Sequence, residues 1–351
     1  VVPKTYIPGY SEFYEERWFA PGTSAKSNTI NLFGQIVPFG VDILFEAPDG
    51  FCFGIEICED LWAPIPPSSY QALGGAAVIF NLSASNEVVG KHAYRMELLR
   101  QQSAKCLAGY VYTSCGINES STDVVFGGHA AIVENGGVLR ESERFTFDRQ
   151  LIYADIDIQK LTFDRLKNTS FMEADIMKSY RRIIFEKRSK EIDKLERPLD
   201  SHPFVPSNPK TMDERCREIF TIQTSGLAKR IKHTSAKCVV LGISGGLDST
   251  LALLVTARAF DMLGISRDKI IAVTMPGFGT TDMTYTNAVE LMESMGVTIK
   301  EISIRESCIQ HFKDIGHDPQ IHDVTYENVQ ARERTQILMD IANKNGGWVV
   351  G

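Results

Sequence analysis

The chain has 351 residues, of which 43% are hydrophobic and 23% are charged, and its formal net charge at pH 7 is −7. This composition is ordinary for a soluble globular protein, and the length predicts two domains. The acidic balance argues against nucleic acid and membrane surfaces as partners, because both favour a basic face. No apolar run reaches the ~20 residues that a membrane-spanning helix needs.

The seven cysteines are scattered without a CxxC pair. This spacing argues against a secreted disulfide framework and a zinc ribbon, and it favours the reducing cytoplasm. The chain opens without Met and closes on GGWVVG, which is typical of a strand just completed. We therefore expect a fragment that is truncated at both ends.

The first part of the chain alternates short apolar runs with turn residues. Two strands are expected around the Pro-Asp-Gly turn of residues 41–58, then a buried strand over 75–85, a helix over 91–109 and a strand over 110–116. Residues 128–142 predict a hairpin, whose Asn-Gly-Gly turn suits positive φ angles. This mixture indicates sheets packed inside helices.

The middle of the chain changes character. Residues 177–196 are highly charged and predict a helix, and the Pro-rich stretch 197–209 is typical of a linker. From about residue 212, helical and strand patterns alternate strictly, which indicates a parallel α/β sheet. We expect a first domain over 1–165, a helical and Pro-rich linker over 166–211, and a second domain over 212–351.

The stretch VVLGISGGLDST combines a strand, a glycine-rich turn and a helix start. Residues 238–243 are short and apolar, as a strand buried on both faces must be, and a helix is expected from 248 to about 263. Gly242, Gly245 and Gly246 allow a sharp turn, and the N–H groups at a helix start bind anions. A plain glycine-rich turn with a Ser or Asp N-cap is the alternative interpretation.

The loop has no Lys where a Walker-type loop would carry one, and it has Asp248 instead. An acid beside phosphates is tolerable only with Mg²⁺ between them. The stretch SGGLDS resembles the pyrophosphate-binding loop of ATP pyrophosphatases, which release pyrophosphate whole. The resemblance implies that ATP is bound by Gly242, Ile243, Ser244, Gly245, Gly246, Leu247, Asp248 and Ser249, with Asp248 as the Mg²⁺ ligand.

A second motif lies near the end of the chain. The sequence YENVQARERTQILMDIAN predicts a helix over residues 326–343, in which Asn328 and Arg332 stand four apart on one face. An amide and a guanidinium together suit a ligand with a carboxylate or a phosphate. A solvated helix face is the alternative interpretation.

The two motifs, with MPGFGTTDMTYTNAVELMESMGV between them, resemble the synthetase domain of NAD⁺ synthetases from about residue 206 onward. The resemblance implies that Asn328 and Arg332 bind deamido-NAD⁺. It also implies a Thr that contacts ATP and a further acidic metal ligand, both expected beyond residue 351.

Cys58 stands at the end of the alternating strand in FGIEICEDLW. A thiol at a strand-to-turn junction faces a pocket while its backbone stays fixed, and it attacks an amide as the thiolate, which needs a nearby cation or base. The alternative is a small buried residue, the usual environment of cysteine and the one we expect for Cys52, Cys106 and Cys238.

The stretches PKTYIPGYSEFYEERWF and NLSAS…GK, on either side of Cys58, resemble the nitrilase-type glutaminase domain that is joined to NAD⁺ synthetases. That family uses a Glu–Lys–Cys triad, so the resemblance implies catalytic roles for Lys4 and Cys58. It implies glutamine binding by Tyr10, Ser85 and Lys91. The general-base Glu is expected before residue 1, and Glu59 is expected to point away from Cys58.

Three histidines in HFKDIGHDPQIHD invite a metal interpretation. Their spacing does not bring His311, His317 and His322 onto one helical face, and Pro319 interrupts the stretch. We expect a loop with incidental histidines.

The resemblance implies an α/β fold with an α-β-β-α nitrilase-like sandwich followed by a doubly wound parallel sheet. It implies the function of glutamine-dependent NAD⁺ synthetases: glutamine supplies ammonia, which amidates deamido-NAD⁺ after adenylation by ATP with Mg²⁺. We expect a cytoplasmic homo-oligomer. Two alternatives remain open, namely another amidotransferase of the ATP-pyrophosphatase type and an inactive nucleotide-binding fragment.

Overall fold

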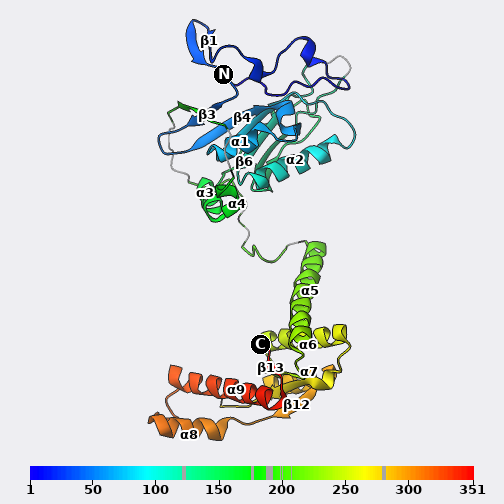
Figure 1. Cartoon of the computed structure of the whole chain (residues 1–351), viewed down its shortest axis with the longest axis vertical. Helices are drawn as coiled ribbons and strands as arrows, with labels where there is room; N and C mark the ends of the chain where they lie inside the picture. Colours follow the sequence, from blue (N-terminus) through cyan, green and yellow to red (C-terminus); the bar gives the residue numbers. More distant parts are fainter. Residues whose placement is uncertain are drawn as a thin grey trace. The chain divides into compact units, whose positions relative to one another are not determined.

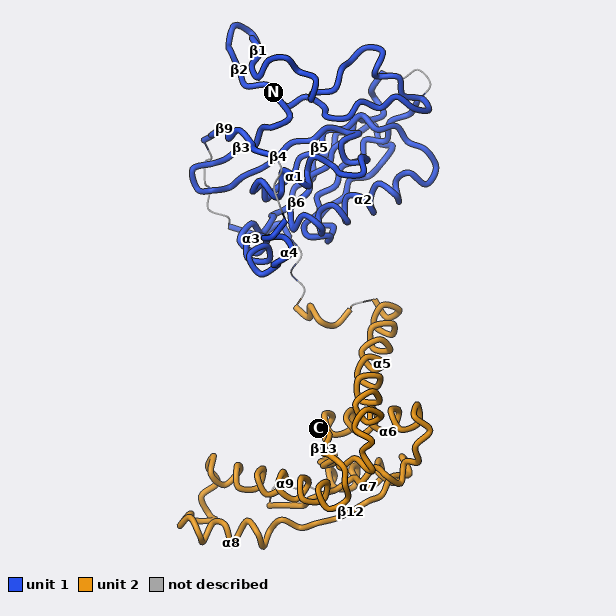
Figure 2. The backbone as a smooth tube through the Cα atoms, in the orientation of Figure 1, with its two compact units in different colours: residues 1–200 blue, residues 201–351 orange. Residues whose placement is uncertain are grey.

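The computed structural model describes residues 1–120, 124–174, 178–186, 193–197, 199, 201–206, 208–278 and 282–351. The chain divides into two compact units, residues 1–200 and residues 201–351 (Figure 2). Among the described residues, no helix is both long enough and apolar enough to cross a membrane.

Unit 1 is built on a mixed sheet of seven strands in the order β8-β7-β6-β5-β4-β3-β9 (Figure 1). Its strands are β3 (Ile43–Glu46), β4 (Cys52–Ile57), β5 (Val78–Ser83), β6 (Gly109–Ser114), β7 (Ala130–Glu134), β8 (Gly137–Glu141) and β9 (Arg181–Ile184). β4, β5 and β6 are parallel, whereas β7 and β8 extend the sheet antiparallel, as the predicted hairpin requires.

Helices α1 (Pro67–Leu73) and α2 (Lys91–Lys105) cover one face of this sheet (Figure 1). Leu99 of α2 packs there against Ile79, Tyr110 and Val133 in one buried cluster. The alternate side chains of the strands, such as Phe53, point to the opposite face and remain partly exposed. The described residues thus supply one of the two large sheets that the expected sandwich has.

The remaining elements of unit 1 lie around this sheet. They are the two-stranded ribbon of β1 (Thr29–Leu32) and β2 (Gln35–Pro38), helices α3 (Ile158–Lys167) and α4 (Thr169–Met172), and three short 3₁₀ helices (Glu15–Arg17, Gly22–Ser24 and Cys58–Trp62). Arg165 of α3 ties its helix to the sheet, because its buried guanidinium donates to the carbonyls of Leu107, Ala76 and Cys106 at 2.8–3.0 Å.

The helix expected over residues 177–196 is wrong at its centre, where residues 181–184 form the edge strand β9. β9 pairs in parallel with β3, and the Arg181 guanidinium donates to Asp42 at 2.8 Å. Phe185, just beyond the strand, packs against Phe51 and Phe53. Pairing with an existing sheet edge overrides the local helical preference, which is a weak determinant. Residues 177 and 187–192 of the same stretch lie outside the described part of the chain.

Unit 2 contains a four-stranded parallel sheet in the order β12-β11-β10-β13. Its strands are β10 (Val239–Gly242), β11 (Ile270–Thr274), β12 (Thr298–Glu301) and β13 (Trp348–Val349). Its helices are α5 (Pro209–Thr234), α6 (Leu247–Leu263), α7 (Asp282–Met295), α8 (Arg305–Ile315) and α9 (Val324–Asn345), and a 3₁₀ turn spans Arg267–Lys269.

Helices cover both faces of the parallel sheet. One core cluster joins the sheet to α5, α6 and α7, and a second joins it to α8 and α9. The strand order reverses between β10 and β13, so the carboxyl end of β10 lies at a switch point, where doubly wound sheets bind ligands. The doubly wound parallel sheet is therefore confirmed, as are the helices expected to end near residue 263 and to span 326–343.

Candidate functional site

In unit 1, a buried carboxylate joins two segments that are far apart in the sequence. Asp60 is 1% exposed and accepts the backbone N–H groups of Thr5 at 3.0 Å, Tyr6 at 2.8 Å and Ile57 at 2.9 Å. The segment that carries Lys4 is thereby held beside the end of β4. Burial raises the pKa of Asp60, and these backbone N–H groups oppose that rise.

Cys58 follows β4 directly and begins the 3₁₀ helix Cys58–Trp62 with a φ of +50°. It is half-buried and lines a cavity of about 490 Å³. The cavity is also lined by Pro8, Tyr10, Ser11, Glu12, Phe13, Glu59, Trp62, Ser85, Val88, Val89, Gly90, Lys91 and Tyr94. The structure thus brings Cys58 together with the predicted glutamine-binding residues Tyr10, Ser85 and Lys91.

Lys4 is not among the residues that line this cavity. Its Nζ atom lies 2.6 Å from Oε2 of Glu15, and its side chain is 14% exposed. Asp60 holds the neighbouring residues Thr5 and Tyr6 against the Cys58 turn, and Glu15, the partner of Lys4, belongs to the 3₁₀ helix Glu15–Arg17.

The cavity carries both signs of charge. Lys91 donates to Asn86 at 2.6 Å and lies 5.5 Å and 5.4 Å from the ring centres of Phe13 and Trp62. Burial lowers the pKa of Lys91, although nearby Glu12 opposes that effect. The opposite sign comes from Glu12 and Glu59.

The expectation that Glu59 points away from Cys58 is wrong, because both side chains line the same cavity. The expectation relied on strand alternation, which ends at the left-handed backbone of Cys58. The Glu59 carboxylate accepts the Tyr10 hydroxyl at 2.9 Å, and burial together with this bond raises the pKa of Tyr10 to about 12. Sequence reasoning missed Glu59 because no local pattern encodes this turn.

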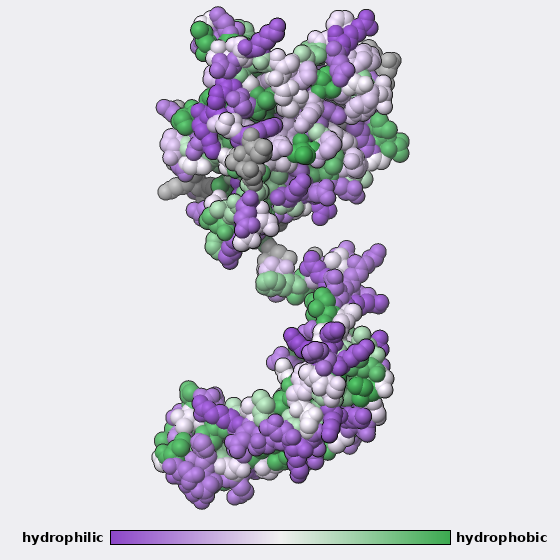
Figure 3. Space-filling model, viewed as in Figure 1, coloured by the Kyte–Doolittle hydropathy of each residue, from purple (hydrophilic) through white to green (hydrophobic). Residues whose placement is uncertain are grey.

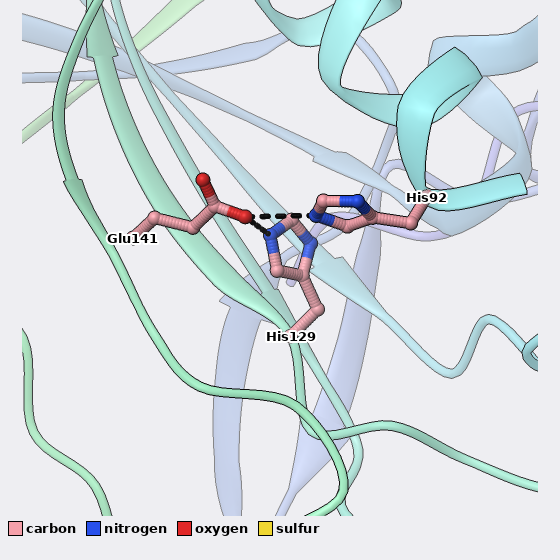
Figure 4. Close-up of side chains that lie close together, drawn as sticks. All are labelled: His92, His129 and Glu141. Carbon is pink, nitrogen blue, oxygen red and sulfur yellow. Dashed lines mark hydrogen bonds and ion pairs between the residues drawn. The ribbon is translucent and has the colours of Figure 1, made fainter.

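A second polar cluster lies between α2 and the β7–β8 hairpin (Figure 4). Oε1 of Glu141 is 2.8 Å from Nε2 of His92 and 3.2 Å from Nε2 of His129. Two imidazoles and a carboxylate are a common metal-ligand set. No sequence motif indicates this cluster, because its three residues come from separate parts of the chain.

The hydrogen bonding of His129 does not fit a metal ion. Nε of Arg95 always carries a proton and donates to Nδ1 of His129 at 3.1 Å. Burial and Arg95 lower the pKa of His129 to about 4, so the ring is neutral and its single proton sits on Nε2, facing Glu141. A metal would need the lone pair of that nitrogen. The cluster is therefore a hydrogen-bonded array that fastens α2 to the hairpin.

In unit 2, the glycine-rich loop follows β10 and ends at the start of α6. Gly245 has a φ of +82°, and a Cβ there would collide with the carbonyl oxygen of Thr284. Hydrogen bonds within the loop stabilise its backbone. Ser249 Oγ accepts the N–H of Ser244 at 3.3 Å and donates to the carbonyl of Gly246 at 3.0 Å. Its backbone therefore has a defined shape at the start of a helix, where anions bind.

Beside this loop is a cavity of about 890 Å³. It is lined by Gly242, Ile243, Ser244, Gly246, Thr274, Met275, Phe278, Thr284, Tyr285, His322, Tyr326, Glu327, Gln330, Ala331, Arg334, Thr335 and Leu338. Of the predicted ATP-binding residues, Gly245, Leu247, Asp248 and Ser249 do not line it. Asp248 lies exposed in the first turn of α6.

Helix α9 presents two polar pairs at i, i+4 spacing to two different hollows. Gln330 and Arg334 line the large cavity, whereas the predicted pair Asn328 and Arg332 is exposed and lines a separate hollow of about 400 Å³. Ala331 and Thr335 belong to the walls of both. The surface over α8 and α9 is largely hydrophilic (Figure 3). The spacing in the sequence could not distinguish the two pairs.

One of the three histidines expected to be incidental takes part in the large cavity. His322 lines it and stacks on Tyr326, with ring centres 4.2 Å apart and an angle of 23° between the planes. His317 instead approaches Asp323 at 3.5 Å. No local pattern in the sequence indicates that His322 lines a cavity, because this position depends on the tertiary structure.

Comparison with known proteins assigns the two units to families. Residues 2–165 match the carbon-nitrogen hydrolase family, and residues 219–351 match the NAD synthase family. Over its full length the chain is 43% identical to the glutamine-dependent NAD(+) synthetases of Mycobacterium tuberculosis and Mycobacterium leprae, and 27% identical to that of Thermotoga maritima. It covers 53%, 53% and 55% of those proteins.

The chain thus joins a stretch that matches the carbon-nitrogen hydrolase family to one that matches the NAD synthase family. Over its full length it is similar to glutamine-dependent NAD(+) synthetases. The chain spans about half the length of the curated relatives that it matches.

Solved structures of the same name include those from Acinetobacter baumannii, in complex with ADP, and Cytophaga hutchinsonii. Each is 22% identical and covers 99% of this chain, with TM-scores of 0.37 and 0.38, and the match spans 53% and 56% of those chains.

The collision at Gly245 can be tested by stability. Gly245→Ala should destabilise the protein by the cost of a positive φ, about 1–2 kcal/mol, plus about 1–3 kcal/mol for the clash with Thr284. Gly264→Ala is the matched control, because Gly264 also has a positive φ, of +65°, but open space around its Cα. Denaturant unfolding of both variants measures the difference. Equal losses would show that the loop yields without cost.

Proposed function

We propose that this protein acts as a glutamine-dependent NAD⁺ synthetase. Unit 1 hydrolyses glutamine to glutamate and ammonia. Unit 2 transfers AMP from ATP to the carboxylate of deamido-NAD⁺ and releases pyrophosphate. Ammonia then displaces AMP and gives NAD⁺. The observation that carries the proposal is the cavity in which Cys58 shares its walls with Tyr10, Lys91 and Glu59.

The charges of that cavity suit an amino acid substrate. Glutamine is a zwitterion, so its α-ammonium group complements Glu59 and its α-carboxylate complements Lys91, both of which line the cavity with Cys58. The Tyr10 hydroxyl, 2.9 Å from Glu59, keeps that carboxylate oriented. The Ser85 side chain, 3% exposed, contributes a hydroxyl to the same wall.

The chemistry in unit 1 is that of a thiol nucleophile. The Cys58 thiolate attacks the side-chain amide, ammonia leaves as the thioester forms, and water then releases glutamate. The ammonium of Lys4 stabilises the tetrahedral oxyanion. Its ion pair with Glu15 at 2.6 Å supports this role, because it holds the ammonium in place.

The chemistry in unit 2 begins with binding of the ATP phosphates by backbone N–H groups of the loop over residues 242–249. The cavity beside the loop, about 890 Å³, is large enough for a nucleotide. Asp248 is an exposed carboxylate in the first turn of α6, which fits the hard oxygen ligand that Mg²⁺ prefers. Bound Mg²⁺ would neutralise charge on the departing pyrophosphate.

We assign the binding of deamido-NAD⁺ to α9. Asn328 and Arg332 line a hollow that shares Ala331 and Thr335 with the nucleotide cavity. A carboxylate bound by Arg332 therefore lies next to the cavity that we propose for ATP, as the transfer of AMP to that carboxylate requires. Gln330 and Arg334, on the cavity side, are positioned for the nucleotide instead.

Replacing the nucleophile should separate the two activities. Cys58→Ala should lower glutamine-driven NAD⁺ synthesis by about 10³-fold or more, because no other group supplies the thioester. Ammonia-driven synthesis should remain, since unit 2 carries out that step. Both rates are measured on the full chain, with Cys106→Ala as a buried-cysteine control. Equal loss of both activities would refute the division of labour.

The charge of Asp248 should be essential to adenylation. Asp248→Asn should reduce ammonia-driven synthesis and Mg·ATP binding by about 10²-fold or more, because an amide cannot supply the negative charge that the metal requires. Glutamine hydrolysis should stay measurable. Asp261→Asn, in the last turn of the same helix, is the control. Normal Mg·ATP binding by Asp248→Asn would remove the metal role.

Arg332 distinguishes a binding site from a solvated helix face. Arg332→Ala should raise the KM for deamido-NAD⁺ roughly ten- to a hundred-fold, since a charge-assisted hydrogen bond contributes about 1.5–3 kcal/mol. The KM for ATP should change little, and Arg332→Lys should restore only part of the loss. Arg217→Ala, an exposed arginine paired with Asp213 at 3.1 Å, is the control, and its effect should be small. An unchanged KM for deamido-NAD⁺ in Arg332→Ala would return this residue to the solvated face.

A further inference from the structure

Cys58 holds a backbone conformation that a residue with a Cβ adopts only at a cost. Its φ of +50° lies in the left-handed region, and such a turn persists only where its surroundings hold it. Side chains hold two successive amides at this strand end. Asp60 accepts the N–H of Ile57 at 2.9 Å, and Oδ1 of Asn81 accepts the N–H of Cys58 at 3.2 Å.

Asn81 has a single possible amide orientation. It lies on the central strand β5, opposite Glu56 of β4, and none of its surface is exposed. Its Oδ1 atom accepts the Ser83 hydroxyl at 2.7 Å besides the N–H of Cys58, and its Nδ2 atom donates to the Tyr110 hydroxyl at 3.1 Å. Rotating the amide by half a turn would set its NH₂ group against the N–H of Cys58.

Behind Asn81 the hydrogen bonds continue to a buried carboxylate. The Tyr110 hydroxyl donates to Glu56, and the same carboxylate accepts the N–H of Ser68 at 2.8 Å. Tyr110 and Glu56 are each 1% exposed. Since the hydroxyl gives its single proton to Glu56, it can only accept from Asn81. The direction of the whole chain is therefore fixed from Asn81 through Tyr110 to Glu56.

Burying this series of hydrogen-bonded polar groups costs free energy that packing alone would not require. Apolar side chains of similar volume would fill the space between β4, β5 and β6 without desolvating a carboxylate and an amide. The chain of hydrogen bonds ends on the backbone of the residue that the proposed function makes the nucleophile. Asn81 itself does not line the cavity that holds Cys58.

We propose that Asn81 is a positioning residue for Cys58, with Tyr110 and Glu56 holding its amide in orientation. The inference rests on the proposed role of Cys58 in glutamine hydrolysis. It has a direct corollary: the N–H of Cys58 is engaged by Asn81, so the oxyanion must be stabilised by other donors, of which the Lys4 ammonium is one.

The test replaces the amide in the full chain. Asn81→Leu keeps the branched shape of the side chain but removes the acceptor of the Cys58 N–H. A small misplacement of the thiol should then lower kcat for glutamine hydrolysis by about a hundredfold. The KM for glutamine should change less than about threefold, because Asn81 lines no part of the cavity. Ammonia-driven synthesis in the same preparation should be unchanged.

Two further variants separate positioning from general stability. Gln71→Met removes another buried amide that packs on β4, but one whose hydrogen bond, at 2.8 Å, ends on the Ile55 carbonyl. It should leave kcat unchanged. Tyr110→Phe removes one hydroxyl and leaves Asn81 in contact with Cys58, so it should lower kcat by about tenfold.

Each outcome decides the proposal. Normal kcat in Asn81→Leu, or equal losses in Asn81→Leu and Gln71→Met, would overturn it. If Asn81→Leu fails to fold, the kcat of Tyr110→Phe decides, and a normal value overturns the proposal. Failure of the proposed function is recognised separately, because Cys58→Ala would then retain glutamine hydrolysis whatever the Asn81 variants show.

Discussion

The geometry of unit 1 depends on the buried carboxylate of Asp60. It accepts backbone N–H groups from Thr5 and Tyr6 on one side and from Ile57 on the other. A buried carboxylate without donors would be expensive, and so would these amides without an acceptor. The carboxylate therefore needs these amides as donors, and the amides need the carboxylate as their acceptor. As a result the segment that carries Lys4 and the turn that carries Cys58 meet, although more than fifty residues separate them in the sequence.

The two units place their functional turns in the same way. In each, a parallel strand ends and the chain turns through a positive φ, at Cys58 in unit 1 and at Gly245 in unit 2. The carboxyl ends of parallel strands expose side chains and backbone groups above a rigid sheet, which suits a site that must not move. The difference lies in how the turn is stabilised. Glycine adopts the conformation freely, whereas Cys58 needs Asn81 and Asp60 to hold it.

Helix α9 shows how one element can line two hollows with different residues. Successive i, i+4 pairs along one helix point about 200° apart when they are offset by two residues. Gln330 and Arg334 thus face the large cavity, while Asn328 and Arg332 face the shallower hollow. Ala331 and Thr335 line both hollows. Because their side chains are small, the two hollows lie close together.

Local pattern determined much of this protein. Buried strands such as 239–242, the glycine-rich turn after it, and the long helix over residues 324–345 follow from periodicity and turn chemistry, which act between near neighbours. The motifs around Cys58 and the loop were sufficient to indicate the family. Tertiary structure alone decided the rest. The strand at 181–184 exists because β3 offers an edge, Glu59 enters the cavity because Cys58 leaves the strand with a left-handed backbone, and Asn81 meets Cys58 only across paired strands. These features depend on contacts between residues far apart in the chain, and such contacts leave no periodic signal in the sequence.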